Sequence, residues 1–381
     1  MSTRRINTVT AGLLLAAAAL SACGDDEGGD STEATSQGTA GGTGDGTTAP
    51  SGTGGEAGAC DPADVVLIGQ VRNETNPYEK SWLDGGDAFA ESVNLSQKRL
   101  TYDGDSQKQQ DQIRQELSSG NTECTVLNVL PNGDADTPPI VSAADEASAW
   151  LVTQWNKPAD LSPSEYDRWV SHLTYNGEES GYQIATAMFE EMGGSGGVIA
   201  LQGILDTSAA KDRFAGLEKA LEESPDVELL EDQTANFSRT EALNVTRTLL
   251  TKHGDDLTGI WAANDDMALG AIQALEAAGR DDVAVVGIDA VPQAIEAIEG
   301  GTMTATVSSD GPWQGGVGLA MGYCAAIGEI DVASLESINR AFYAEQFLVT
   351  ADNAGEFASP EANLEDFSCD AVFNRASAEL P

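Results

Sequence analysis

The sequence is poor in basic residues, with 19 Lys and Arg against 62 Asp and Glu among 381 residues and a formal net charge of −43. A chain this acidic cannot neutralise a row of phosphates, which excludes nucleic acid as a partner and an electrostatic hold on an anionic membrane. Histidine is rarer still, and neither His172 nor His253 has neighbours typical of a metal site. No Cys-x-x-Cys pair is present, so we expect no zinc site, no other metal and no cofactor.

Patterns typical of enzymes are also missing or misplaced. Residues 193–197 fit Gly-x-Ser-x-Gly, but they follow a predicted helix and precede a predicted strand, the reverse of a nucleophile elbow. Residues 103–105 and 134–136 carry too few ligands for a calcium loop. The glycines of 41–46 have no strand before them and form no phosphate loop. We therefore expect a protein that is not an enzyme.

The N-terminus has no apolar run of the roughly 20 residues that a transmembrane helix needs. Arg4 and Arg5 precede an apolar run over 9–20, which ends in Leu-Ser-Ala-Cys23. This is a secretory signal pattern, and the residues around Cys23 resemble a bacterial lipobox. The resemblance implies a signal peptide over 1–22 and a lipid on Cys23. The alternative is a plain signal peptide with an incidental cysteine.

Residues 23–59 contain almost only Gly, Ser, Thr, Ala, Asp and Glu, with no aromatic residue, Leu, Ile, Val, Lys or Arg after Cys23. Such a segment cannot bury enough apolar surface to offset its ordering entropy, so it is predicted to be a disordered tether. Export behind a signal peptide predicts an extracytoplasmic, membrane-anchored protein. It also excludes cytosolic roles such as gene repression.

Four cysteines remain after the anchor: Cys60, Cys124, Cys324 and Cys369. An even number in an exported chain suggests disulfides, and four cysteines allow three pairings. Cys60 and Cys124 each precede a predicted strand, whereas Cys324 lies in a late helix and Cys369 in the C-terminal tail. We favour Cys60–Cys124 and Cys324–Cys369, and the second bond requires the tail to pack on the first lobe of the fold.

Short apolar runs alternate with helical patterns along the rest of the chain. Strands are expected at 64–71, 98–102, 124–130, 150–155, 197–202, 227–230, 258–262, 283–288, 303–307 and 341–349. Helices are expected at 77–93, 105–119, 139–148, 178–192, 208–224, 239–253, 265–278, 292–299 and 312–328. This alternation predicts an α/β fold with two parallel sheets, each covered on both faces by helices.

The residues that follow the expected strands are polar or planar. They include Arg72, Asn73, Asn76, Tyr78, Asp103, Asn156, Lys157, Asp206, Arg213, Phe237, Asn264, Asp265, Asp289, Ser309 and Asp310. Ligands of open α/β sheets bind beyond the carboxyl ends of the strands. Asn, Asp and Arg form paired hydrogen bonds and aromatic rings offer flat faces, a mixture suited to a polyhydroxylated ring. The alternative is that many of these residues are helix caps and turn formers.

Four motifs that occur in a fixed order indicate a particular protein family. They are residues 199–213, Trp261-Ala-Ala-Asn264 with its continuation to 271, Val285-Val-Gly-Ile-Asp289, and Gly301-Thr-Met-Thr-Ala-Thr-Val307. Together they resemble the ribose-binding-protein branch of the type I periplasmic sugar-binding proteins, over about 61 to 350. The resemblance implies two doubly wound lobes that are joined by three hinge crossings and close on a sugar. It also implies a monomer that delivers this sugar to an ABC permease.

The resemblance also implies the lobe boundaries. The N-terminal lobe is expected over 60–156 plus 310–335 and the C-terminal lobe over 157–309 plus 336–350. A C-terminal tail is expected over 351–381.

Matching motif by motif implies nine ligand-binding residues: Asn76, Tyr78, Asn156, Lys157, Arg213, Phe237, Asn264, Asp289 and Ser309. The sequence departs from the family at Glu79, which replaces a second stacking aromatic, and at Asn156-Lys157, which replaces an Asp-Arg pair. Trp155, Trp313 and an insert over 158–169 are additional. These departures count against ribose itself and suggest a ligand of different size or shape. Trp155 is either a core or a site residue, whereas Trp261 is expected in the core.

The expected function is capture of a monosaccharide or related polyol between two lobes. A sugar sensor that presents its ligand to a receptor remains an alternative, as does a binder of a non-sugar solute. An amino acid ligand would call for a Ser/Thr-rich carboxylate clamp, which the sequence lacks. An exported hydrolase would need a paired acid and base in the cleft.

Overall fold

The computed structural model describes residues 59–118 and 120–381. The expected signal peptide, Cys23 and nearly all of the expected tether lie outside these residues. Within the described part, no helix has both the length and the apolar character needed to cross a bilayer.

The first lobe is built on a seven-stranded sheet with the order β13-β11-β5-β4-β3-β1-β2. Its strands are β1 Val66–Val71, β2 Gln97–Thr101, β3 Thr125–Val129, β4 Trp150–Gln154, β5 Trp169–Thr174, β11 Ala341–Ala344 and β13 Ala376–Glu379. All neighbouring strands are parallel except β11 and β13. The central strands β3 and β5 are buried at every residue, as expected for strands covered on both faces.

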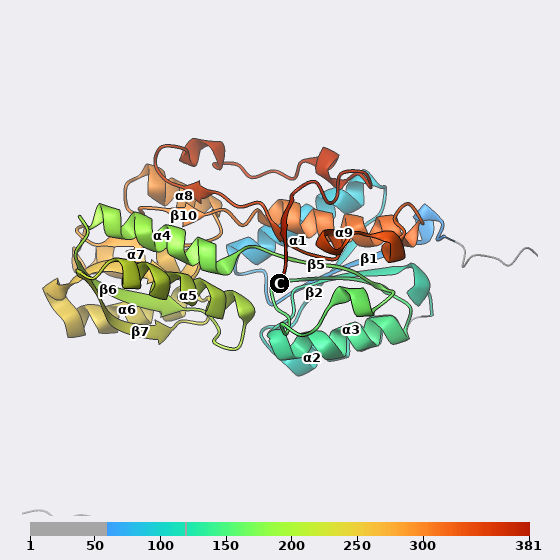
Figure 1. Ribbon diagram of the computed structural model, residues 1–381, viewed down its shortest axis with the longest axis horizontal. Helices are drawn as coiled ribbons and strands as arrows, with labels where there is room; N and C mark the ends of the chain where they lie inside the picture. Colours follow the sequence, from blue (N-terminus) through green and yellow to red (C-terminus); the bar gives the residue numbers. More distant parts are fainter. Residues whose placement is uncertain (1–58, 119) are drawn as a thin grey trace, which may run out of the picture. The chain divides into compact units, whose positions relative to one another are not determined.

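Helices cover both faces of this sheet (Figure 1). They are α1 Pro77–Ser92, α2 Ser106–Leu117, α3 Thr137–Glu146, α9 Gly311–Ala326 and the short α10 Ser337–Arg340. Helices α1 and α9 pack against each other on one face, and α2 and α3 cover the other. The α1–α9 contact depends on glycine, because a Cβ on Gly85 or Gly315 would lie 1.9 or 1.7 Å from a backbone oxygen of the opposite helix.

The second lobe holds a four-stranded parallel sheet with the order β7-β6-β8-β9. Its strands are β6 Gly196–Gln202, β7 Val227–Thr234, β8 Leu257–Ala262 and β9 Ala284–Val286. Its helices are α4 Gly177–Glu191, α5 Ser208–Glu223, α6 Arg239–His253, α7 Asp265–Ala278 and α8 Pro292–Glu299. Strands β10 Thr306–Val307 and β12 Leu348–Val349 pair antiparallel beside it. Trp261 is fully buried in β8, which confirms its expected place in the core.

The chain crosses between the lobes four times. Three crossings match the expected hinge: from β5 to α4, from β10 to α9, and from β11 to β12. The fourth is the C-terminal segment 350–375, whose short helix Ala354–Glu356 contacts α8 and whose helix Leu364–Phe367 contacts α9. The tail therefore touches both lobes before it ends in the first sheet.

Two disulfides link the cysteines in the favoured pairs. Cys60 and Cys124 have Cα atoms 5.8 Å apart, and Cys324 and Cys369 have Cα atoms 5.6 Å apart. The first bond joins the start of the described chain to the entry of β3. The second fixes the C-terminal segment to α9, as packing of the tail on the first lobe requires.

The sheet membership corrects the expected lobe boundaries. Residues 157–174 and 341–344 were expected in the C-terminal lobe, but β5 and β11 are strands of the first sheet. The strand β5 was missed because polar residues interrupt its apolar pattern. Ser171 Oγ donates to the backbone oxygen of Asn339 at 2.9 Å, and His172 Nδ1 pairs with Thr153 Oγ1 at 2.8 Å. These internal partners allow both residues to be buried in a central strand.

Candidate ligand-binding site

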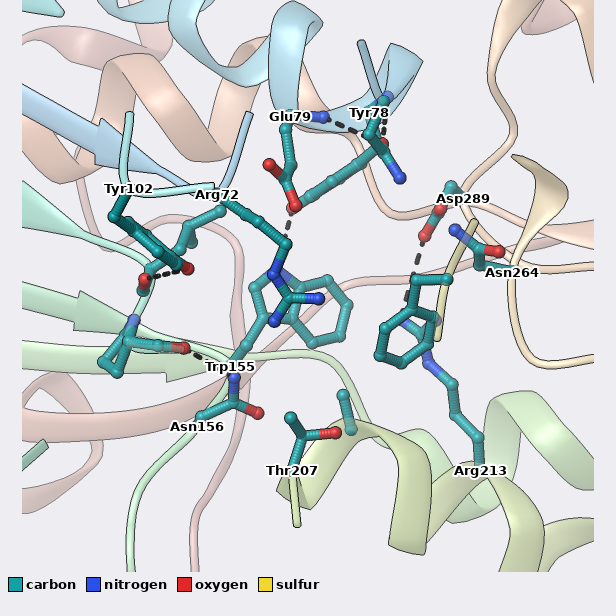
Figure 2. A pocket seen from close by; sticks show the side chains of 15 residues that line it. Arg72, Tyr78, Glu79, Tyr102, Trp155, Asn156, Thr207, Arg213, Asn264 and Asp289 are labelled. Carbon is teal, nitrogen blue, oxygen red and sulfur yellow. Dashed lines mark hydrogen bonds and ion pairs between the residues drawn. The ribbon is translucent and has the colours of Figure 1, made fainter. Parts of the chain in front are cut away.

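A cavity lies between the two lobes, at the carboxyl ends of both sheets (Figure 2). The first lobe contributes Arg72, Asn76, Tyr78, Glu79, Tyr102, Leu130, Pro131, Trp155 and Asn156. The second lobe contributes Thr207, Ala209, Arg213, Phe237, Asn264 and Asp289. This position is where open parallel sheets bind their ligands.

Seven of the nine predicted site residues line this cavity: Asn76, Tyr78, Asn156, Arg213, Phe237, Asn264 and Asp289. The structure thus brings together residues that lie more than 200 positions apart in the sequence.

Two asparagines at the cavity also cap helices. Asn76 Oδ1 accepts from the backbone N–H groups of Tyr78 at 2.9 Å and Glu79 at 3.3 Å, at the start of α1. Asn264 Oδ1 accepts from Met267 N–H at 3.0 Å, at the start of α7. Because these bonds engage the amide oxygens, each side chain keeps its Nδ2 group as a donor at the cavity. The same two residues therefore cap helices and line the cavity.

Arg213 lies in the second lobe's wall of the cavity and contacts residues of both lobes. Its side chain is 4% exposed, and its Nη1 donates to the backbone oxygen of Ala263 at 2.6 Å. Its Nη2 lies 3.7 Å from Asp289 Oδ1, and its guanidinium lies 4.8 Å from the centre of the Trp155 ring. Burial raises the pKa of Asp289 well above its usual range, and the positive charge of Arg213 partly opposes that rise.

Trp155 forms part of the opposite wall. Its backbone has a φ of 69°, which is rare for a bulky residue, and Asn156 N–H donates back to Gln154 O at 2.9 Å. Its Nε1 donates to the Tyr78 hydroxyl at 3.0 Å, and that hydroxyl in turn bonds the side-chain oxygen of Gln314. This network holds the indole ring on the cavity wall, so Trp155 is a cavity residue as well as a buried one.

The tight turn at Trp155 also corrects the prediction for Lys157. Asn156 lines the cavity, with its Nδ2 donating to Pro131 O at 2.8 Å and its Oδ1 buried without a partner among the described residues. Lys157 instead lies at a different cavity, near His172, and its Nζ donates to Pro158 O at 3.2 Å. The residues that face the cavity are therefore Trp155 and Asn156, one position earlier than predicted.

Ser309 is the second predicted residue that does not line the cavity. It is fully buried at the β10–α9 crossing, where its N–H donates to Asp289 O at 3.2 Å. This bond holds the backbone of Asp289, which lines the cavity.

The prediction omitted Arg72, Glu79 and Tyr102 from the site. Arg72 Nη2 donates to Asn132 Oδ1 at 2.9 Å, and Glu79 Oε2 accepts from Asn73 N–H at 2.7 Å. Burial raises the pKa of Glu79 to about 7. A signal for Arg72 was available, because it directly follows a buried strand. Glu79 stood out only as a departure from the family pattern.

A carboxylate of the first lobe bonds the second lobe at the neighbouring cavity, where Lys157 also lies. Asp134 Oδ1 accepts from Ser208 N–H at 2.9 Å and from Ser208 Oγ at 2.7 Å. Its Oδ2 lies 2.7 Å from Lys211 Nζ. A carboxylate at a helix N-terminus interacts favourably with the helix dipole, so Asp134 holds the start of α5 against the first lobe. Together with the contact between Arg213 and Trp155, this bond joins the two lobes.

Comparison with known proteins agrees with this architecture. A family model described as periplasmic binding protein domain matches residues 71–330. The chain belongs to the type I periplasmic sugar-binding proteins. The ribose import binding protein of Salmonella typhimurium is 32% identical over 244 residues, which cover 64% of this chain and 78% of that protein. The xylitol-binding protein of Mycolicibacterium smegmatis is 28% identical over 267 residues, covering 70% of this chain and 74% of that protein.

A solved structure extends the match over most of the described chain. The crystal structure of a twin-arginine translocation pathway signal protein from Burkholderia phytofirmans superimposes with a TM-score of 0.80 and 37% identity. It covers 83% of this chain and 98% of that protein. Type I periplasmic binding proteins bind solutes and are not enzymes. In residues 59–118 and 120–381, no group of three or more His, Cys, Asp or Glu side chains is placed to hold a metal ion.

Proposed function

We propose that this protein captures a monosaccharide or a related polyol between its lobes and delivers it to an ABC permease. The observation that carries the proposal is the composition of the cavity, where amide, guanidinium and carboxyl groups from both lobes surround aromatic faces. The relatives named for ribose and xylitol support a ligand of this chemical class.

The polar groups of the cavity suit a ligand with many hydroxyl groups. Asn76, Asn264 and Arg213 offer donors, while Asp289 and the buried Oδ1 of Asn156 offer acceptors. A hydroxyl group both donates and accepts, so neighbouring hydroxyls can satisfy such a mixture in pairs. The rings of Trp155 and Phe237 would cover the C–H faces of the ligand.

The first lobe presents Trp155 and Asn156 to the cavity. Neither residue belongs to an Asp-Arg pair of the kind that ribose binders carry in this segment. The ligand therefore differs from ribose in its size or in the pattern of its hydroxyl groups.

Binding is coupled to closure in this proposal. Residues of both lobes complete the ligand's hydrogen bonds only when the lobes approach each other, so the ligand shifts the population toward the closed form. The permease then recognises the closed form. A lipid on Cys23 and the tether that follows it would keep the protein at the outer face of the cell membrane, close to that permease.

Thermal unfolding of the purified protein tests this proposal against a panel of pentoses, hexoses, polyols and amino acids. A ligand at 100 times its Kd stabilises the folded state by about 2.7 kcal/mol. For a protein of this size we expect each kcal/mol to raise Tm by roughly 2–4 °C. A shift with a sugar or polyol, recovered chemically unchanged, supports the proposal. A shift only with an amino acid would refute the ligand class and leave the fold unaffected.

A further inference from the structure

The first lobe brings two charged side chains, Arg72 and Glu79, to the cavity wall. Neither was among the residues predicted to bind the ligand. Arg72 follows the last residue of β1, and Glu79 lies in the first turn of α1. Figure 2 shows both side chains on the same side of the cavity, across from Arg213 and Asp289. The two lobes thus each present one guanidinium and one carboxyl group.

Glu79 is held at the cavity by its backbone and its side chain. Its N–H donates to the cap Asn76, and its Oε2 accepts from Asn73 N–H at 2.7 Å. These bonds and the N–H of Arg72 fix the carboxyl group at the cavity wall, where it can accept from a ligand. An aromatic ring in this position would offer only an apolar face, whereas a carboxylate requires a donor.

Arg72 is fixed by the loop after β3. Its Nη2 donates to both the backbone oxygen and Oδ1 of Asn132, at 3.2 and 2.9 Å. Asn132 is itself held, because its Nδ2 donates to Ser106 Oγ at 2.9 Å. The Nε of Arg72 is buried and has no hydrogen-bond partner among the described residues. A buried donor without a partner is costly, so it marks a position where a ligand acceptor would be favourable.

We propose that Arg72 and Glu79 are specificity-determining residues, which recognise adjacent hydroxyl groups of the ligand in place of the stacking ring and the Asp-Arg pair of ribose binders. This inference rests on the proposed function, since it assigns the polar contacts of the same cavity. It predicts that the ligand presents a hydroxylated edge to α1.

A pH dependence follows from the surroundings of Glu79. The groups that act on its charge are Arg72, through its guanidinium and its N–H, Asp266 of α7, and the Asn73 N–H that it accepts from. Tyr102 and Asp289, which also line the cavity, interact with it electrostatically as well. Burial dominates and raises the pKa of Glu79 to about 7. A ligand hydroxyl that donates to the carboxylate favours its ionised form, so ligand affinity rises with pH between about 6 and 8.

Calorimetric titration tests the inference. The ligand is the sugar or polyol that raises Tm most in the panel, which includes xylitol and ribose. The variants are Glu79→Gln and Arg72→Met, and the matched control is Glu91→Gln, an exposed carboxylate on the same helix. We expect each of the first two to weaken binding by about 10-fold to 100-fold at pH 8, the range for a hydrogen bond to a charged group. Glu79→Gln should also remove the rise in affinity between pH 6 and 8, and the control should retain it.

The outcomes separate this inference from the proposed function. If the wild-type protein binds no sugar or polyol, the proposed function fails and the inference falls with it. If the wild type binds but Glu79→Gln has wild-type affinity and an unchanged pH profile, the inference alone is refuted. Thermal unfolding of each variant shows whether it is folded. If Glu79→Gln does not fold, the loss expected for Arg72→Met decides the question, and wild-type affinity in that variant refutes the inference.

Discussion

Replacing Arg213 by Met tests the buried pair that anchors the second lobe's side of the cavity. The change removes the guanidinium 3.7 Å from Asp289 and the donor to the backbone oxygen of Ala263, while it keeps much of the side-chain volume. Asp289, with a side chain 5% exposed, would be left without its positive partner. We expect loss of stability as well as loss of ligand binding.

The expected size follows from the geometry. When Asp289 is ionised, its charge lies 3.7 Å from Arg213 Nη2, and two unit charges at that distance interact by about 4.5 kcal/mol at an effective dielectric constant of about 20. Removal of one partner from a buried ionised pair costs about 3–5 kcal/mol. Because burial already raises the pKa of Asp289, protonation of its carboxyl group lowers this cost, so the loss should be largest at high pH. Neutralising Asp289 as well, with Asn, should recover part of that loss. In the double-mutant cycle of Arg213→Met and Asp289→Asn, we expect a coupling free energy of about 2–3 kcal/mol.

Denaturant unfolding of the wild type, the two single variants and the double variant measures this coupling without ligand. Arg247→Ala, an exposed arginine of the same lobe, is the control and should lie close to the wild type. If the two changes add to within about 0.5 kcal/mol, the residues do not interact and the reasoning about this pair is refuted.

Three further predictions concern pH, closure and the C-terminal segment. Because the pKa of Glu79 is raised from 4.5 to about 7, its folded form binds more protons than the unfolded chain between these values. The free energy of unfolding should therefore fall as pH rises from about 4.5 to 7, and Glu79→Gln should reduce this fall; an equal slope in both proteins contradicts it. Asp134→Asn should speed ligand dissociation several-fold in stopped-flow experiments, because it weakens the bonds to α5, and an unchanged rate would remove Asp134 from closure. Replacing Cys324 and Cys369 together by Ser should lower the free energy of unfolding by about 4 kcal/mol, given their separation of 45 residues; a loss below about 1 kcal/mol contradicts this.

Most of the fold followed from the sequence because its local patterns agree with the tertiary structure. The helices at 239–253, 265–278 and 292–299 have the expected bounds, since each starts at a clear cap or proline. Strand β5 could not be predicted in this way, because Ser171 and His172 find partners only in the folded protein. Strand β13 was missed because three of its four residues are exposed.

The residues that line the cavity were predictable where several linked motifs fix the alignment of this sequence with the family. Asn264 and Asp289 lie shortly after the ends of β8 and β9 and line the cavity, as their motifs imply. The prediction of which side chains face the cavity was wrong by one position at 155–157. The side-chain directions there depend on the positive φ of Trp155, which no sequence pattern indicates. Arg72 and Glu79 were passed over because their place at the cavity depends on how β1, α1 and the loop at Asn132 pack together.

Calorimetric titration of the wild-type protein and of Arg213→Met, with the panel member that raises Tm most, tests whether this cavity captures a sugar or polyol. We expect saturable one-to-one binding of a sugar or polyol that is recovered intact, with affinity lowered at least about 100-fold in Arg213→Met and unchanged in Arg247→Ala. Wild-type affinity in Arg213→Met, or conversion of the sugar to a product, would contradict the claim that this cavity captures the ligand.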